Sequence, residues 1–170
     1  LLFKNTDYNM CRKTKFGELA YHNALQSNMN FKHGAVITKG SKVIVSSMNQ
    51  GNRTKTLGQI HSSVHAEIAV ASQLINRFIR KKTRNRNNYK DYLKKYIIWV
   101  VRAPNTKYEL KQDFRNSLPC HMCINKLMSL GFSKIGYSNE EGTMTVTHLK
   151  KISKTKYSSA QRMYGEHFVN

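Results

Sequence analysis

Two short stretches of the sequence, residues 65–67 (His-Ala-Glu) and residues 119–123 (Pro-Cys-His-Met-Cys), restrict what this chain can fold into. Cys120 and Cys123 are three apart, so on a helix they lie about one turn from each other on the same face. His65 adds an imidazole, and one imidazole with two thiolates suits a tetrahedral zinc ion that keeps its fourth position open. The fold must therefore bring two distant segments into contact.

Glu67 is interpreted as a proton carrier rather than as a fourth ligand. An open position on zinc holds a water molecule, whose pKa the ion lowers to about 7, and a nearby carboxylate can move protons between that water and a substrate. A basic nucleic-acid binder with a structural zinc is the alternative, disfavoured because a closed site needs a fourth protein ligand. His61 and His121 are interpreted as neighbours of the site rather than as ligands.

The two stretches resemble the signature of the zinc-dependent nucleobase deaminases, the cytidine deaminase superfamily, which is H-x-E followed by P-C-x-x-C. Both halves match without departure. The resemblance implies a hydrolase of the CMP/dCMP-deaminase type that acts on C–N bonds in cyclic amidines. It implies Zn²⁺ on His65, Cys120 and Cys123, with Glu67 as the catalytic group. It also implies an α/β fold with three α-β-α layers around a five-stranded mixed sheet.

Five further residues are predicted to contact the substrate. The resemblance implies that Asn49 hydrogen-bonds the sugar of the target nucleotide, although an asparagine followed by Gln-Gly is also typical of a turn. The backbone N–H of Ala66 can contact the base. Arg53 and Lys55, in the polar stretch before the zinc histidine, are candidate phosphate contacts. Ser117 lies just before the second motif and is expected near the substrate.

The net charge of +20, from 29 Lys and Arg against 9 Asp and Glu, predicts a polyanionic partner, most simply single-stranded nucleic acid. The alternative is compositional, because Lys and Asn are also abundant in proteins from AT-rich genomes. Residues 80–95 form the most basic run and interleave cations with aromatic rings, as single-strand binders do, although a solvated insertion is the alternative. The candidate contacts there are Arg80, Lys81, Lys82, Arg84, Arg86 and Tyr89.

Length and patterning predict a single domain over residues 1–170. The turn at 139–142 leaves no room for a crossover helix, so the strands that flank it are expected to be antiparallel. The expected elements are an irregular lead-in (1–13), a helix from 14 to about 28, strands 32–38 and 42–48, a polar loop (50–64), a helix (64–80), a basic insertion (80–95), a strand (96–101), a helix (120–130), strands 133–138 and 143–147, and a final helix (158–168).

Other classes of protein are less consistent with the sequence. No apolar run approaches the roughly 20 residues of a membrane span. With three cysteines, two of them assigned to metal, no disulfide framework is expected, which favours an intracellular setting in the cytoplasm or nucleus. The sequence leaves the oligomeric state open, a homo-oligomer included.

The predicted function is conversion of cytosine to uracil in single-stranded nucleic acid, with DNA favoured over RNA. A free cytidine or dCMP deaminase of pyrimidine salvage is the first alternative, which the short turn at 139–142 favours. An adenosine deaminase acting on tRNA or DNA is the second, which the Cys-x-Met-Cys spacing favours.

Overall fold

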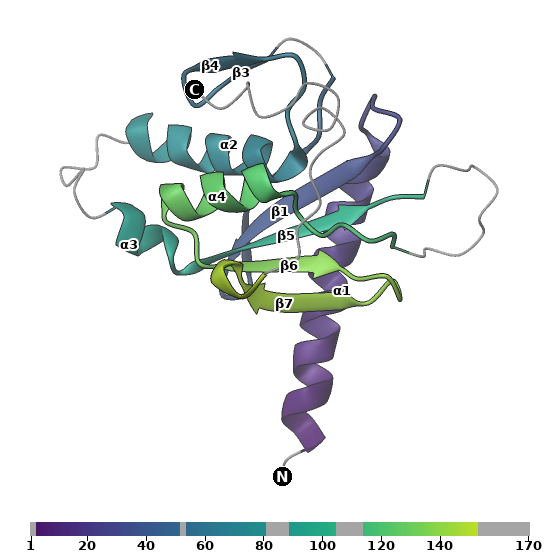
Figure 1. Ribbon diagram of the computed structural model, residues 1–170. Helices are drawn as coiled ribbons and strands as arrows, with labels where there is room; N and C mark the ends of the chain where they lie inside the picture. Colours follow the sequence, from purple (N-terminus) through teal and green to yellow (C-terminus); the bar gives the residue numbers. More distant parts are fainter. Residues whose placement is uncertain (1–2, 52–53, 81–88, 105–113, 153–170) are drawn as a thin grey trace.

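The computed structural model describes residues 3–51, 54–80, 89–104 and 114–152, and its centre is one five-stranded mixed sheet (Figure 1). The strand order is β2-β1-β5-β6-β7. The parallel pair is β5–β6, and the other three pairs are antiparallel, which confirms the predicted arrangement of the last two strands. The strands are β1 (His33–Lys39), β2 (Lys42–Met48), β5 (Tyr96–Arg102), β6 (Lys134–Ser138) and β7 (Met144–His148).

Helices cover both faces of the sheet, which confirms the three-layer prediction (Figure 1). One face carries α1 (Phe3–Leu25), and the other carries α2 (Ala66–Arg80) and α4 (His121–Leu130). The short α3 (Tyr89–Leu93) leads into β5, and a 3₁₀ turn, η2 (Leu149–Lys151), follows β7. No helix in the described ranges is both long and apolar enough to cross a bilayer.

Strand β5 contributes to two hydrophobic cores because its side chains alternate between the two faces. Ile98 and Val100 pack in the core beneath α2 and α4, whereas Trp99 and Val101 pack in the core beneath α1. The indole Nε1 of Trp99 donates to Oγ1 of Thr38 at 2.9 Å, so its polar atom is satisfied inside that core. Coverage on both faces explains why residues 97–101 of this strand are all apolar.

The prediction of an irregular lead-in over residues 1–13 is wrong for residues 3–13, because α1 begins at Phe3. Residues 3–16 contain neither proline nor glycine, so the sequence has no residue that would stop the helix from extending toward the N-terminus. A capping residue such as Thr14 marks a helix start only when the chain before it leaves the helical conformation.

The predicted polar loop over residues 50–64 contains a small hairpin, β3 (Thr54–Thr56) and β4 (Gln59–His61). Its two-residue turn places Leu57 at φ 51° and Gly58 at φ 85°. Positive φ at both positions is what a type I′ hairpin turn needs, but Leu-Gly lacks the usual Asn-Gly or Asp-Gly signal.

The predicted basic insertion over residues 80–95 is partly helical, because α2 ends at Arg80 and α3 occupies residues 89–93. An exposed ion pair one turn apart, between Lys94 Nζ and Asp91 Oδ1 at 2.6 Å, supports this helix end. Residues 81–88 and the predicted final helix (158–168) lie outside the described residues.

Gly34 of β1 lies where α1 packs on the sheet. A Cβ atom there would overlap the backbone oxygen of Ala20 and the backbone nitrogen of Ala24, and these atoms can move only if α1 moves. We expect Gly34→Ala to lower the free energy of unfolding by more than about 3 kcal/mol in urea denaturation. Ser46→Ala, on the exposed side of β2, should stay within about 0.5 kcal/mol of the parent. An unchanged midpoint for Gly34→Ala would contradict this close approach.

Candidate zinc centre

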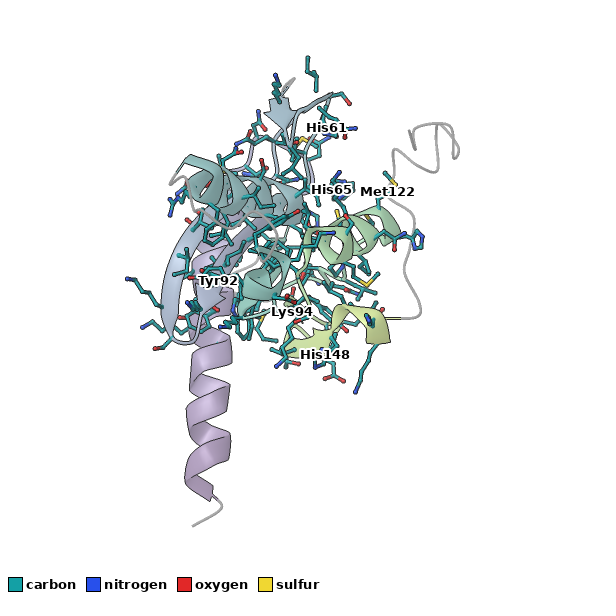
Figure 2. The ribbon with its side chains drawn as sticks, turned by 90° about the vertical axis from the view of Figure 1, so that its left-hand side faces the viewer. His61, His65, Tyr92, Lys94, Met122 and His148 are labelled. Atoms are coloured by element: carbon teal, nitrogen blue, oxygen red, sulfur yellow. The ribbon has the colours of Figure 1, made fainter. Side chains whose placement is uncertain are left out.

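The N-terminal ends of α2 and α4 bring the two sequence motifs together. His65 immediately precedes α2, and its backbone oxygen accepts hydrogen bonds from the N–H groups of Ile68 (3.1 Å) and Ala69 (2.9 Å). Cys120 is the N-cap of α4, and Cys123 lies in its first turn. Figure 2 shows His65 at the same end of the molecule as Met122, the residue before Cys123. Free N–H groups and the positive dipole end of a helix favour anionic thiolates at such positions.

The three predicted ligands converge with the spacing of a tetrahedral zinc site. Nδ1 of His65 lies 3.5 Å from Sγ of Cys120 and 3.3 Å from Sγ of Cys123. A zinc ion with Zn–N near 2.05 Å and Zn–S near 2.3 Å would place nitrogen and sulfur about 3.6 Å apart at tetrahedral angles. All three ligand atoms lie within 4.8 Å of one another. These residues therefore fit a His-Cys-Cys zinc site, with Nδ1 as the imidazole ligand.

The protonation of the ligands follows from their close approach. Hydrogen bonds from Cys123 and His65 lower the pKa of Cys120 to about 4, and the hydrogen bond with Cys120 raises the pKa of His65 to about 9. The hydrogen bond to Cys120 and burial raise the pKa of Cys123 well above its ordinary value. At pH 7 the metal-free site therefore combines one thiolate with an imidazolium and a thiol.

Because zinc binds neutral imidazole and thiolate, we expect binding at pH 7 to release about two protons, one from His65 and one from Cys123. Zinc affinity should then fall as the pH is lowered. Calorimetric titration of the metal-free protein in two buffers with different ionisation enthalpies measures the number released. Release of no protons would contradict the assigned protonation states.

Glu67 lies beside the three ligands without being one of them. Among the described residues, the metal-type side chains that converge are His65, Cys120 and Cys123. The Glu67 side chain is only 4% exposed, and burial raises the pKa of its carboxyl group, although the charge of His65 opposes this shift. A buried carboxyl group with a raised pKa keeps its proton to a higher pH than an exposed one. The proton-carrying role of Glu67 stays a prediction.

Asn49 is buried at the start of the chain segment that leads to the zinc site. Its Oδ1 accepts hydrogen bonds from Oγ of Ser27 (2.6 Å) and the backbone N–H of His33 (2.9 Å), and its Nδ2 donates to the backbone oxygen of Phe31 (2.7 Å). One of the two Nδ2 hydrogens is left for another acceptor. The amide is thus held rigidly, and its contact with a substrate sugar stays a prediction.

Ser117 is also buried, and its hydroxyl group belongs to a local network. It donates to the backbone oxygen of Val100 (2.8 Å) and accepts from the backbone N–H of Ser138 (2.9 Å). These bonds fix the segment before Cys120 to β5 and β6. The structure therefore gives Ser117 a positioning role, and its predicted proximity to a substrate stays untested.

The other predicted contacts lie at different places. Ala66 is the first residue of α2 and is fully buried beside the zinc histidine, whereas Lys55 is exposed on β3. The side chain of Arg80 is not described, and Tyr89 is 39% exposed at the start of α3. The remaining candidates, Arg53, Lys81, Lys82, Arg84 and Arg86, lie outside the described residues.

The basic stretch around α3 lies at the opposite end of the sheet from the zinc centre. Strand β5 starts next to α3 and ends at Arg102, so its seven residues separate the two regions by about 20 Å. Figure 2 shows Tyr92 and Lys94 well away from His65. Any nucleic-acid contact at α3 would therefore involve nucleotides distant from the reacting base.

Sequence reasoning missed two residues near the zinc centre, His33 and Arg102, which are direct partners on β1 and β5. Burial, together with the charges of His65 and Arg102, lowers the pKa of His33 to about 4. Strand periodicity could have placed Arg102 on the zinc face, because side chains two residues apart share a face and Ile98 and Val100 lie on that one.

Comparison with known proteins agrees with the geometry. The profile described as "Cytidine and deoxycytidylate deaminase zinc-binding region" matches residues 10–139, more than half of the 170-residue chain. No curated protein matches the sequence. A crystal structure of cytidine deaminase from Burkholderia pseudomallei is similar in fold, with a TM-score of 0.50 and 20% identity, covering 80% of this chain and 91% of that one. The matched profile and the His65–Cys120–Cys123 zinc site together show that the chain belongs to the cytidine and deoxycytidylate deaminase family and is a zinc-dependent deaminase.

Proposed function

We propose that this chain deaminates cytosine to uracil in single-stranded nucleic acid, with DNA favoured over RNA. The observation that carries the proposal is the excess of positive charge. With 29 cationic side chains and 9 acidic ones, 20 positive charges would remain even if every acid were paired. A polyanion neutralises such an excess and gains affinity by releasing its own counterions.

The chemistry is proposed to use the groups around the zinc centre. His65, Cys120 and Cys123 would hold the zinc ion, which would supply Lewis-acid activation of a water molecule. Glu67 takes a proton from the water and delivers it to the ring N3 while the water oxygen forms a bond to C4. Glu67 then takes the remaining proton of that oxygen and delivers it to the amino group, so that the C4–N bond breaks as the C4=O bond forms. Cytosine and water thereby become uracil and ammonia.

Two residues are proposed to hold the target nucleoside in this geometry. The backbone N–H of Ala66 lies next to the zinc histidine, and its own side chain is a single methyl group. Asn49 offers its remaining Nδ2 hydrogen to the sugar, and its three other hydrogen bonds keep the amide in place. A base stacked within a duplex cannot reach these groups, so the strand must be single or the base flipped out.

A second candidate function is deamination of free cytidine or dCMP. The antiparallel pairing of β6 with β7 across a short turn favours it, because the resemblance to the deaminase superfamily implies such a connection in the free-cytidine deaminases. The chain also resembles the cytidine deaminase from Burkholderia pseudomallei in fold, which is consistent with this candidate. At 20% identity the likeness concerns the fold alone. The excess charge is what favours a polymer.

A substrate panel tests the proposal. Zinc-loaded protein is offered single-stranded DNA, single-stranded RNA, matched duplex DNA, deoxycytidine and dCMP, and products are read by mass as a gain of about one unit per deamination. We expect turnover on single strands, more on DNA than on RNA, and little on the duplex. Binding to the single strand should weaken steeply with salt, as expected when several phosphates are held. Turnover on the monomers alone would contradict the proposal and support the second candidate.

A further inference from the structure

The side chain of Arg102, the last residue of β5, projects from the face of the sheet that carries the zinc centre. Ile98 and Val100 of the same strand belong to the core beneath α2 and α4, and side chains two residues apart point to the same face. His33, the direct partner of Arg102 on β1, lies on this face as well, as Ala35 does. The register therefore places a cation at the zinc end of the sheet.

The guanidinium of Arg102 has no hydrogen-bond acceptor or anionic partner within the described part of the chain. Its Nε is buried and makes no hydrogen bond there. Its Cζ lies 4.7 Å from the ring centroid of Phe31, which is itself 50% exposed. A cation–π contact holds the guanidinium plane but provides no hydrogen-bond acceptor for its N–H groups. A buried donor without an acceptor is unfavourable.

The strand partner of Arg102 adds no charge at pH 7, and the anion that also acts on this partner is the Cys120 thiolate of the zinc site. Burial, with the charges of His65 and Arg102, keeps the pKa of His33 near 4, so this imidazole is neutral at pH 7. The backbone N–H of Arg115 donates to the backbone oxygen of Arg102 at 2.9 Å, which brings a second arginine into the adjacent segment. No carboxylate of the described residues pairs with Arg102.

We propose that Arg102 binds a phosphate group of the nucleotide substrate beside the zinc centre. Arginine presents a planar fork of donors that matches phosphate oxygens, and one of those oxygens would accept the bond that Nε lacks. Phe31 contacts the guanidinium group from one side, so the Arg102 side chain loses less conformational freedom when it binds a phosphate. The inference rests on the proposed function, because the phosphate belongs to the nucleotide that carries the target base. A monoester of dCMP and a diester of a strand offer the same oxygens.

Kinetics on substrates with and without phosphate test this role. Arg102→Met keeps an unbranched apolar side chain and removes the charge together with the donor fork. Arg102→Lys keeps the charge and removes the fork. We expect Arg102→Met to lower kcat/KM about 10- to 100-fold on whichever of dCMP and the oligonucleotide is turned over, and less than about 2-fold on deoxycytidine. Arg102→Lys should recover part of the loss.

Lys42→Met is the matched control, because Lys42 is an exposed cation at the far end of the sheet. It should leave kcat/KM on dCMP and deoxycytidine unchanged. Zinc content and the unfolding midpoint of each variant exclude a folding defect as the cause. Equal losses on dCMP and deoxycytidine in Arg102→Met, or no loss on either phosphorylated substrate, would overturn the phosphate role.

A binding measurement separates this inference from the proposed function. In ¹H–¹⁵N NMR spectra, the Arg102 Nε–H signal is the arginine signal that Arg102→Lys removes. We expect inorganic phosphate to shift this signal saturably in the zinc-loaded parent protein. If no substrate is deaminated, the proposed function fails, and the phosphate titration still decides the role of Arg102. An Nε–H signal that does not respond to phosphate would overturn the inference.

Discussion

Glu67→Gln is expected to lower turnover about 10⁴-fold while the protein keeps its zinc. Glutamine has the size of glutamate and fills the same buried position, but it cannot accept or release a proton at neutral pH. A positioned acid–base group contributes about 10²–10⁴-fold to rate, and the upper end is expected here because one carboxyl group handles several proton transfers. Steady-state kinetics together with metal analysis of the purified variant measure both quantities.

The control for this result is Glu18→Gln, the same chemical change at an exposed position on α1, across the sheet from the zinc centre. It should leave turnover and zinc content unchanged. Loss of zinc from Glu67→Gln would identify Glu67 as a metal ligand and contradict its role as proton carrier. Turnover within about 10-fold of the parent would show that another group carries the proton.

Cys123→Ser is expected to abolish zinc binding and, with it, deamination. Serine keeps the approximate shape of the buried side chain but does not ionise to an anion that resembles a thiolate. The parent should gain about 4 kcal/mol of stability when free zinc exceeds the Kd about 1,000-fold, which corresponds to a rise of about 8–16 °C in Tm. The variant should show no such response in calorimetric scans with and without zinc.

His121→Ala is the matched comparison for the metal site. His121 lies between the two cysteines in sequence, yet it is exposed, and its Nε2 lies 2.9 Å from Nδ2 of Asn125. This variant should keep both its zinc and the zinc-dependent rise in Tm. If His121→Ala loses zinc as Cys123→Ser does, the ligand set derived from the distances would be wrong.

Arg102 and the cations and rings around α3 are both predicted to contact a polyanion, and the location of the zinc centre gives them different roles. Arg102 lies at the zinc end of β5 and could meet only a phosphate close to the target base. The cations and rings around α3 lie at the other end of the same strand, where Lys39 Nζ donates to the hydroxyl group of Tyr92 at 3.0 Å. A strand long enough to reach both ends would be held at two separate places, and a mononucleotide at one.

The sequence alone determined the chemistry, because that information is local. The residue types and short spacings within 65–67 and 119–123 identify the metal and its ligands, and predict the proton carrier, before any fold is known. The sheet was also predictable in outline, since β5 is apolar on both faces and five residues between β6 and β7 cannot hold a crossover. The hairpin β3–β4 was not, because its Leu57-Gly58 turn lacks the common signal.

The tertiary structure decided which other residues share the site with the metal. Charge along the sequence directed attention to residues 80–95, but the length of β5 places that stretch at the far end of the sheet. The pairing of β5 with β1 sets Arg102 opposite His33 on the zinc face, without an anionic partner among the described residues. Strand register depends on contacts between segments distant in sequence, so no local pattern specifies it.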